Sequence, residues 1–224
     1  MLGFISSGLL RIRCKVALDA IIGNPVSQTI AYQIGDNLYL NITDHCTLRC
    51  QFCPKFNESL KLRSYDLKLE HKPSVDELIE AIGDPQRYQQ IVFCGYGEPT
   101  LRLKTLLTVA KYIKEHGGKT RLNTDGLGNL VHKRNILIEM KDLIDAISIS
   151  MNAARPDVYE FHCQPQLKGS YDAMMMFLTR APNYIRDVTA TAIEGLDGVN
   201  IDDCRDIADW LGVKFRVRQL NRLG

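Results

Sequence analysis

An α/β fold built around a mainly parallel sheet is the class that the sequence predicts. Short apolar runs rich in β-branched residues alternate with longer stretches of helical periodicity, the pattern of βα units joined by right-handed crossovers. The chain has 224 residues, which is enough for one hydrophobic core and short for two, so we expect one main domain. Apolar residues make up 45% and charged residues 24%, which excludes a disordered or fibrous chain.

The first structured part of the chain is expected at residues 29–43, as two short strands around the turn signal Gly35-Asp36. The helix that follows is predicted over PSVDELIEAIG. Ser74 and Glu77 form a capping box at its start, and Gly83 ends it. The second strand leads directly into a cluster of cysteines.

Five more strands are expected after this helix, and helical stretches separate them. In order, the strand and helix segments are QQIVFCG, LRLKTLLTVAKYIKEHGG, KTRLNTDG, NILIEMKDLI, DAISISMN, PDVYEFH, SYDAMMMFLTRA, RDVTATAIEG, IDDCRDIADWLG and VKFRVRQL. In folds of this class the chemistry gathers where the parallel strands end, on the loops that lead into the helices. We therefore expect the functional residues at those strand ends.

Charge and cysteine usage indicate the compartment. The net charge of +2 and the pI of about 8.1 are too mild to imply a nucleic acid or an anionic membrane as partner. The N-terminal run MLGFISSGLL precedes its basic residues, unlike an export signal, and no segment is long and apolar enough to span a bilayer. Seven cysteines, an odd number, fit a reduced compartment, so we expect a cytoplasmic protein with no membrane partner.

Three of the cysteines form the pattern CxxxCxxC in the loop after the first parallel strand: Cys46, Cys50 and Cys53. A structural zinc ion takes four protein ligands, so zinc would need His45 or a distant cysteine as well. In a cluster of four irons and four sulfurs ([4Fe-4S]) each iron needs one outside ligand. Three thiolates would leave one iron open, and an open position distinguishes a catalytic metal site from a structural one.

The segment CTLRCQFC resembles the cluster motif of the radical S-adenosylmethionine (SAM) superfamily, CxxxCxφC, with Phe52 as its aromatic residue. The resemblance implies a [4Fe-4S] cluster on Cys46, Cys50 and Cys53. It also implies that the open iron binds the amino and carboxylate groups of the methionine part of SAM. Phe52 would then lie near the adenine.

Later strand ends add to this resemblance. CGYGEPT is similar to the GGEP motif of the family and departs from it at Tyr96, and LNTDG is similar to its TNG-type turn. SISMN matches a position from which relatives supply short polar side chains to the ribose, and Ser150 and Asn152 alternate by two and so share a face. The resemblance implies SAM contacts from Tyr96, Gly97 and Glu98, then from Asn123, Thr124 and Asp125, and from Ser150 and Asn152.

The resemblance also implies a fold and a mechanism. The fold is a partial, open (β/α)6 barrel similar to a TIM barrel. Residues 37–224 would form the radical SAM core, and residues 1–36 an N-terminal extension with a short strand. The segments VFCGYGEPTLRL, RLNTDGLGN and FRVRQL resemble the sequences of a smaller group of radical SAM proteins linked to TatD-type nucleases.

The implied mechanism is a one-electron reaction. An external donor such as flavodoxin or ferredoxin would reduce the cluster, SAM would be cleaved, and a 5'-deoxyadenosyl radical would take a hydrogen atom from a small-molecule, peptide or protein substrate. Two other classes of protein stay open: an iron-sulfur electron carrier with a fourth thiolate, and a zinc-stabilised interaction module. Neither would use the glycine-glutamate turn or the polar pair on SISMN.

The other notable residues have simpler interpretations. We expect Cys94 and Cys204 to be small buried apolar side chains, and Cys163 to be a core residue rather than a ligand. His45 is expected to form hydrogen bonds beside the cluster without binding iron. The run MMM at residues 174–176 is interpreted as helix core with one exposed face, and the basic residues of loop 55–72 as a solvated surface.

Overall fold

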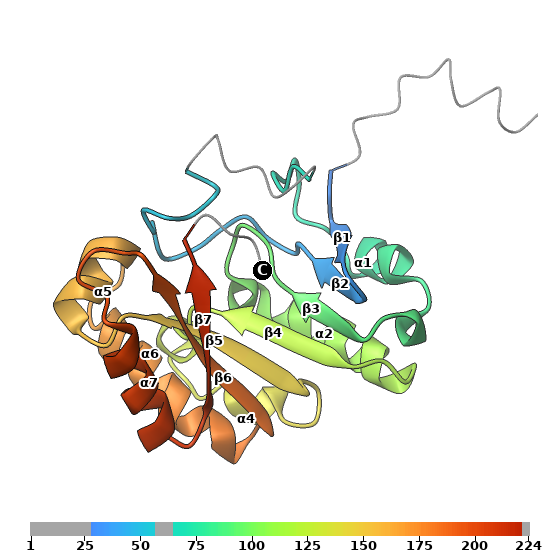
Figure 1. Ribbon diagram of the computed structural model, residues 1–224. Helices are drawn as coiled ribbons and strands as arrows, with labels where there is room; N and C mark the ends of the chain where they lie inside the picture. Colours follow the sequence, from blue (N-terminus) through green and yellow to red (C-terminus); the bar gives the residue numbers. More distant parts are fainter. Residues whose placement is uncertain (1–27, 57–64, 221–224) are drawn as a thin grey trace, which may run out of the picture.

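In the computed structural model, which describes residues 28–56 and 65–220, the strands form one seven-stranded sheet in the order β1-β2-β3-β4-β5-β6-β7 (Figure 1). Strands β2 to β7 are parallel, and β1 pairs with β2 in the antiparallel direction. The strand bounds are β1 Ala31–Ile34, β2 Asn37–Leu40, β3 Gln90–Phe93, β4 Thr120–Thr124, β5 Ala146–Asn152, β6 Asp187–Glu194 and β7 Lys214–Gln219. The predicted hairpin and the six predicted parallel strands are confirmed.

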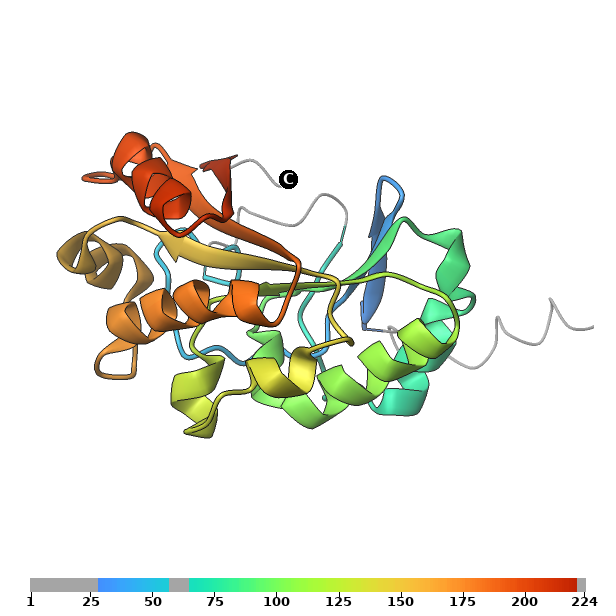
Figure 2. The ribbon, with the colours of Figure 1, turned by 90° about the horizontal axis from the view of Figure 1, so that it is seen from below.

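The sheet is an open barrel. β2 pairs with β1 and β3, and β7 pairs only with β6, so the two ends of the parallel set do not close. Figure 2 shows the sheet curved, with the helices along its outer side and a gap between its first and last strands. The helices are α1 Val75–Ile82, η1 Pro85–Arg87, η2 Pro99–Arg102, α2 Leu103–Glu115, α3 Gly128–His132, α4 Leu137–Met140, α5 Pro156–Cys163, α6 Ser170–Arg180, η3 Ala181–Asn183 and α7 Ile201–Trp210. The predicted α/β class and open barrel are confirmed.

The predicted capping box forms at the start of α1. The backbone N–H of Glu77 donates to the Ser74 hydroxyl at 3.2 Å, and the backbone N–H of Ser74 donates to the Glu77 carboxylate at 2.8 Å. Gly83 follows the helix with a φ of 61°, a conformation that glycine adopts at little cost. Leu78 and Ile82 are buried on one face, so the sequence signals for this helix all agree.

The segment NILIEMKDLI differs from its prediction. Only Leu137–Met140 is helical, because Asp142 takes a left-handed φ of 67° just beyond it. The preceding loop contains a short helix, α3, that the pattern did not predict. Gly128 at its start lies so close to Ile136 that a Cβ would be 2.4 Å from the Ile136 side chain. Only the short α4 therefore lies within the predicted helix, and α3 precedes it.

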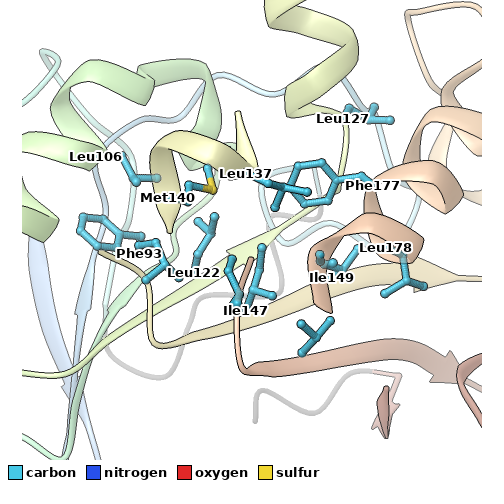
Figure 3. Close-up of a cluster of buried hydrophobic side chains, with 14 of the residues drawn as sticks. Phe93, Leu106, Leu122, Leu127, Leu137, Met140, Ile147, Ile149, Phe177 and Leu178 are labelled. Carbon is cyan, nitrogen blue, oxygen red and sulfur yellow. The ribbon is translucent and has the colours of Figure 1, made fainter. Parts of the chain in front are cut away.

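The hydrophobic core lies between the outer face of the sheet and the helices (Figure 3). Every second strand residue points to this face: Leu122 of β4, and Ile147 and Ile149 of β5, are all buried in the core. Helix residues such as Leu106 and Phe177 cover them. The period of two along each strand therefore assigns one face of the sheet to the core.

The opposite, concave face of the sheet is polar along β4 to β7. A cavity there is lined by Asn123, Ser148, Ser150, Thr191 and Arg216, which alternate with the core residues of β4 to β7. Closed eight-stranded barrels fill their interior with bulky apolar side chains. In this open barrel the interior instead presents hydrogen-bonding groups around a cavity.

Other predictions about helices and segments can be placed on the structure. Met174 is fully buried and Met176 is 53% exposed, which confirms the one-sided packing of the MMM run. No helix in the described ranges is both long and apolar enough to cross a membrane. Cys14 and most of the predicted extension 1–36 lie outside the described residues, as do Lys61 and Arg63 of loop 55–72.

Candidate active site

The three cysteines of the motif lie in the loop that follows β2, at the carboxyl edge of the sheet. All three side chains are half-buried, and Cys50 and Cys53 line the cavity. Within residues 28–56 and 65–220, no three His, Cys, Asp or Glu side chains are close enough together to hold one metal ion. The three thiols therefore do not converge on a single point as the ligands of one zinc ion do.

The cysteine loop is fixed to the end of α5 by backbone hydrogen bonds. Three of them join the two segments: Arg49 N to Cys163 O at 3.0 Å, Gln51 N to His162 O at 2.9 Å, and Gln166 N to Thr47 O at 3.0 Å. Loop backbone at a protein surface is usually mobile, but these bonds hold it against a packed helix. These bonds thus fix the segment that carries Cys46, Cys50 and Cys53 relative to the end of α5.

Cys46 lies beside an acidic side chain. Its Sγ is 3.9 Å from Oδ2 of Asp125, and the backbone N–H of Leu48 donates to Sγ at 3.4 Å. Burial, followed by the charge of Asp125, raises the pKa of the Cys46 thiol to about 12. A metal ion bound next to Cys46 would favour its thiolate form.

Cys50 contacts Cys163, which is fully buried at the end of α5. A hydrogen bond from Cys50 to Cys163, together with burial, raises the pKa of Cys50. Asn152 also donates to the Cys163 Sγ, at 3.4 Å. Cys163 is a buried residue as predicted, and it supports a predicted ligand directly. The structure does not bring Cys163 into the cavity.

The turn after β3 packs tightly against the cysteine loop at Gly97. A Cβ at this position would lie 2.5 Å from the carbonyl oxygens of both Thr43 and His45. The next residue, Glu98, donates its backbone N–H to the same His45 carbonyl at 2.8 Å. Only glycine permits this approach of two backbones, so the motif residue joins the two loops of the site.

Glu98 is buried, with 3% of its surface exposed, and its carboxylate accepts four hydrogen bonds. Oε1 accepts from the Thr100 N–H at 2.9 Å, from the Thr100 hydroxyl at 2.7 Å and from the Thr124 hydroxyl at 2.8 Å. Oε2 accepts from the Asp125 N–H at 2.7 Å. Glu98 therefore joins the turns after β3 and β4, while Oε2 retains room for one further donor from the cavity.

Asp125 is the second buried acid of the site, with 6% of its surface exposed. Its Oδ1 accepts from the Leu127 N–H at 2.9 Å. Burial, followed by the nearby Glu98 carboxylate, raises the pKa of Asp125 well above its usual value. Among the described side chains no cation forms an ion pair with either acid. Two adjacent buried carboxylates of this kind fit a ligand that carries positive charge.

The cavity between the cysteine loop and the concave face has a volume of about 250 Å³. Most of the side chains predicted to bind SAM line it: Phe52, Tyr96, Gly97, Glu98, Asn123, Thr124, Asp125 and Ser150. The structure therefore brings together residues that are almost 100 positions apart in the sequence.

Three buried polar atoms near the cysteine loop and the cavity have no hydrogen-bond partner among the described residues. Oδ1 of Asn123 belongs to the cavity wall, whereas Oδ1 of Asn152 and the hydroxyl of Tyr159, which lies near Cys46 and Cys50, do not. Buried polar atoms are normally hydrogen-bonded, so such orphaned atoms indicate a missing ligand or water. Together with the three thiols and the two acids, they fit a cluster and a cationic, hydroxyl-bearing cosubstrate.

Asn152 departs from the expected geometry. The strand pairing shifts register between Ser150 and Asn152, and Asn152 has a left-handed φ of 62°. Its side chain points to Cys163, so Ser150 lines the cavity and Asn152 does not. The alternation by two predicted a shared face, and the irregularity of the strand removes it.

Three other expectations can be compared with the structure. Cys94 is half-buried and lines the cavity, where the Asn123 side chain donates a hydrogen bond to it, whereas we expected a small apolar side chain in the core. The His45 side chain is 66% exposed and contacts the Asp44 carboxylate at 2.8 Å. Cys204 is fully buried on α7, as expected.

Sequence reasoning missed the arginines of the cavity and the buried Tyr159. Arg216 and Arg218 of β7 line the cavity, and Arg121 of β4 lies next to them. A signal was present in KFRVRQ, because its basic residues recur with a period of two and so share one face of the strand. Tyr159 lies on α5, and nothing in the local sequence distinguishes it from a core aromatic residue.

The open α/β barrel with a cysteine loop at its carboxyl edge defines an enzyme fold. A model of the family described as the Radical SAM superfamily matches residues 40–211. The chain therefore belongs to the radical SAM superfamily, whose members use a [4Fe-4S] cluster and SAM. It is a radical SAM enzyme. The narrower resemblance to the TatD-linked group stays a prediction.

Two curated proteins are similar to parts of the chain. It is 26% identical over 171 residues to "GTPase Obg" of Brachyspira hyodysenteriae, covering 73% of this chain and 23% of that protein. It is 24% identical over 188 residues to "Probable GTP 3',8-cyclase" of Thermococcus kodakarensis, covering 82% of this chain and 56% of that protein. The chain thus spans about a quarter and about half of the lengths of these two relatives.

Solved structures resemble the fold. TYW1 with a lysine-pyruvate adduct bound has a TM-score of 0.57 at 14% sequence identity, covering 82% of this chain and 64% of that chain. Streptococcus suis SuiB bound to S-adenosylmethionine has a TM-score of 0.55 at 14% identity, covering 81% of this chain and 38% of that chain. At this identity the likeness concerns the fold alone.

Proposed function

We propose that the chain binds a [4Fe-4S] cluster through Cys46, Cys50 and Cys53, binds SAM in the cavity beside it, and cleaves SAM reductively. The observation that carries this proposal is the convergence of the cysteine loop and the buried acids Glu98 and Asp125 on one cavity. Cys46, Cys50 and Cys53 would hold the cluster, which would supply the one-electron reduction of the SAM sulfonium that precedes removal of a hydrogen atom from the substrate.

The roles of the protein residues are binding and orientation. Asp125 and the free side of Glu98 Oε2 face the cavity and are suited to the ammonium group of the methionine part. Asn123 offers its unpartnered Oδ1 to a hydroxyl group, and Ser150 offers a hydroxyl on the same face. Phe52 lines the cavity beside Cys53 and provides an apolar surface for the adenine.

Three of the predicted SAM contacts have a more indirect role in this proposal. Thr124 donates its hydroxyl to Glu98 and so positions the acid. Gly97 permits the approach of the cysteine loop, and Tyr96 beside it lines the cavity. Asn152 supports Cys163, which contacts Cys50. Thr124, Gly97 and Asn152 would thus each act on SAM or the cluster through a neighbouring residue, whereas Tyr96 would contact the ligand directly.

The domain division and the partners are part of the same proposal. Residues 37–224 would form the radical SAM core, and residues 1–36 an extension of which β1 is the described strand. The electron would come from an external donor such as flavodoxin or ferredoxin. The relatives have names that imply different reactions, so the substrate is not carried over from either of them.

The test compares two cysteine variants of the full chain after anaerobic reconstitution with iron and sulfide. Cys50→Ala removes a predicted ligand, and Cys204→Ala removes a buried cysteine of α7 that is far from the motif in sequence and outside the cavity. We expect Cys50→Ala to lose the iron and all reductant-dependent formation of 5'-deoxyadenosine, while Cys204→Ala keeps both.

Other outcomes would identify another class of protein. Deoxyadenosine formation by Cys50→Ala at the parent rate would contradict the proposal. A parent protein that binds four irons without affinity for SAM would be an electron carrier, because a fourth thiolate would then occupy the open iron. A colourless parent with one zinc ion per chain would be a zinc-stabilised module.

A further inference from the structure

The strands of the open barrel bring three arginine side chains together on the concave face. Arg216 and Arg218 lie two residues apart on β7 and line the 250 Å³ cavity. Arg216 also borders a smaller recess of about 150 Å³ with Arg121 of β4, so it lies between the two spaces. We propose that these three arginines bind an oxyanion, a phosphoryl or carboxylate group, of the substrate. This inference rests on the proposed function, because it names the substrate class of the same cavity.

The arginines have no acidic partner. Within the described part of the chain, none of the seven ion pairs includes Arg121, Arg216 or Arg218. Arg121 donates one hydrogen bond, to the Tyr39 hydroxyl at 3.2 Å, while its Nε is buried without a partner. Burial, followed by the charges of the two other arginines, lowers the pKa of Arg216. Partly buried like charges of this kind are unfavourable unless an anion joins them.

The neighbouring lysine of the same strand shows the contrast. Lys214 pairs with Asp187 of β6 at 2.9 Å, although both side chains are well exposed. Among the described residues the exposed lysine is thus paired with an acid and the more buried arginines further along the strand are not, although Asp187 also borders the smaller recess. If the arrangement served stability alone, an acid would be expected beside the more buried arginines, because solvent screens their charges least.

SAM itself does not account for all three guanidinium groups. Its methionine part has one carboxylate, and its ammonium and sulfonium groups are positive. Glu98 and Asp125, which border the cavity at the ends of β3 and β4, match these positive groups. One carboxylate can neutralise at most one arginine, so at least two guanidinium groups remain for another ligand. Guanidinium groups bind phosphoryl and carboxylate oxygens in a bidentate manner.

The wall around the arginines suits a polar ligand. The hydroxyl-bearing residues Ser148 and Thr191 line the same cavity, on β5 and β6 between Arg121 and Arg216. A substrate whose oxyanion binds at β7 would extend its other end toward the cysteine loop. The arginines would then set the orientation in which a hydrogen atom is presented.

The test is isothermal titration of the full chain with inorganic pyrophosphate and, separately, with succinate, both with the cluster and SAM loaded and in the cluster-free form. We expect one of the two anions to bind. Arg216→Gln and Arg218→Gln should each weaken this binding at least tenfold, and Arg216→Lys should restore part of it. Arg180→Gln, which removes an exposed arginine on α6, should change binding less than twofold and serves as the matched control.

The preferred probe identifies the anion: pyrophosphate indicates a phosphoryl substrate, and succinate a carboxylate. Absence of binding by both probes, or equal loss in Arg180→Gln, would overturn the inference. Displacement of the anion by saturating SAM would also overturn it, because the arginines would then serve the SAM carboxylate. Since 5'-deoxyadenosine formation is measured separately, active protein that binds neither anion contradicts only this inference, and inactive protein that binds one contradicts only the proposed function.

Discussion

Gly97 offers the most quantitative test of how the two loops of the site are joined. In Gly97→Ala the new Cβ would lie 2.5 Å from two carbonyl oxygens and 2.7 Å from the backbone nitrogen of His45, where ordinary contacts begin at 3.4 Å. All three atoms belong to backbone, so no side chain can rotate away. Either the cysteine loop or the turn after β3 must therefore move by about 1 Å to relieve these contacts.

The cost follows from this displacement. Overpacking of this kind costs about 1 to 3 kcal/mol. The 2.8 Å hydrogen bond from Glu98 N to His45 O would weaken or break, at a further cost of about 1 kcal/mol. Alanine reduces the conformational entropy of the unfolded chain relative to glycine, and this effect offsets about 0.4 to 1 kcal/mol of the destabilisation. The net destabilisation of about 1 to 3.6 kcal/mol corresponds to a fall in Tm of about 2 to 14 °C for a chain of this size.

The assay is differential scanning calorimetry of the cluster-free variant, combined with iron analysis after reconstitution. Gly169→Ala is the control, because its φ of 71° makes alanine strained by about 1 to 2 kcal/mol while the space around it is open. We expect both variants to lose stability, and only Gly97→Ala to bind less iron. A Tm within 1 °C of the parent, with full iron binding, would refute the argument that backbone contact joins the loops.

Two further predictions concern the scaffold. In Glu77→Gln the pH dependence of stability should change: the Ser74 backbone N–H, followed by His71, lowers the pKa of Glu77 to about 2 from 4.5, so its stabilisation is present above about pH 4.5 and is lost as the pH falls toward 2. Thermal melts should therefore differ between parent and variant near neutral pH and converge in acid, and a constant difference would contradict this origin. In Phe93→Ala the removal of a fully buried ring should cost about 3 to 5 kcal/mol in urea unfolding, and a cost below 1 kcal/mol would show that Phe93 does not pack as described.

Local signals in the sequence were sufficient for the elements whose stability is local. The capping box of Ser74 and Glu77 and the glycine that ends α1 are contained within ten residues, and the structure follows them. The alternation of strands and helices was likewise enough for the parallel sheet, whereas its open form was predicted from the family resemblance. The predicted helix over NILIEMKDLI failed because Asp142 adopts a left-handed backbone, which the apolar pattern does not reveal.

Features of the site that depend on contacts distant in sequence could be predicted only in part. The motif residues Glu98 and Asp125 were named from the sequence, but their mutual proximity and the bonds from Thr124 arise from the packing of separate strands. The irregularity before Asn152 turned that side chain to Cys163. A strand pattern states which residues share a face and not which face becomes the interior of the barrel.

The same limit explains why the arginines were missed. The period of two in KFRVRQ puts its basic residues on one side of β7. An exposed edge strand with such a side would be ordinary, because charged side chains often protect sheet edges. Only the curvature of the sheet turns this side toward the cavity and next to Arg121. The charge imbalance of the interior is therefore a property of the assembled barrel.

The central claim is that three cysteines hold a cluster with one iron open to SAM. The most direct measurement is the electron paramagnetic resonance spectrum of the reduced, anaerobically reconstituted chain before and after the addition of SAM. The account predicts a [4Fe-4S] signal, four irons per chain and a spectrum that shifts when SAM binds the open iron. A spectrum that SAM leaves unchanged, or protein that holds a single zinc ion and gives no such signal, would contradict it.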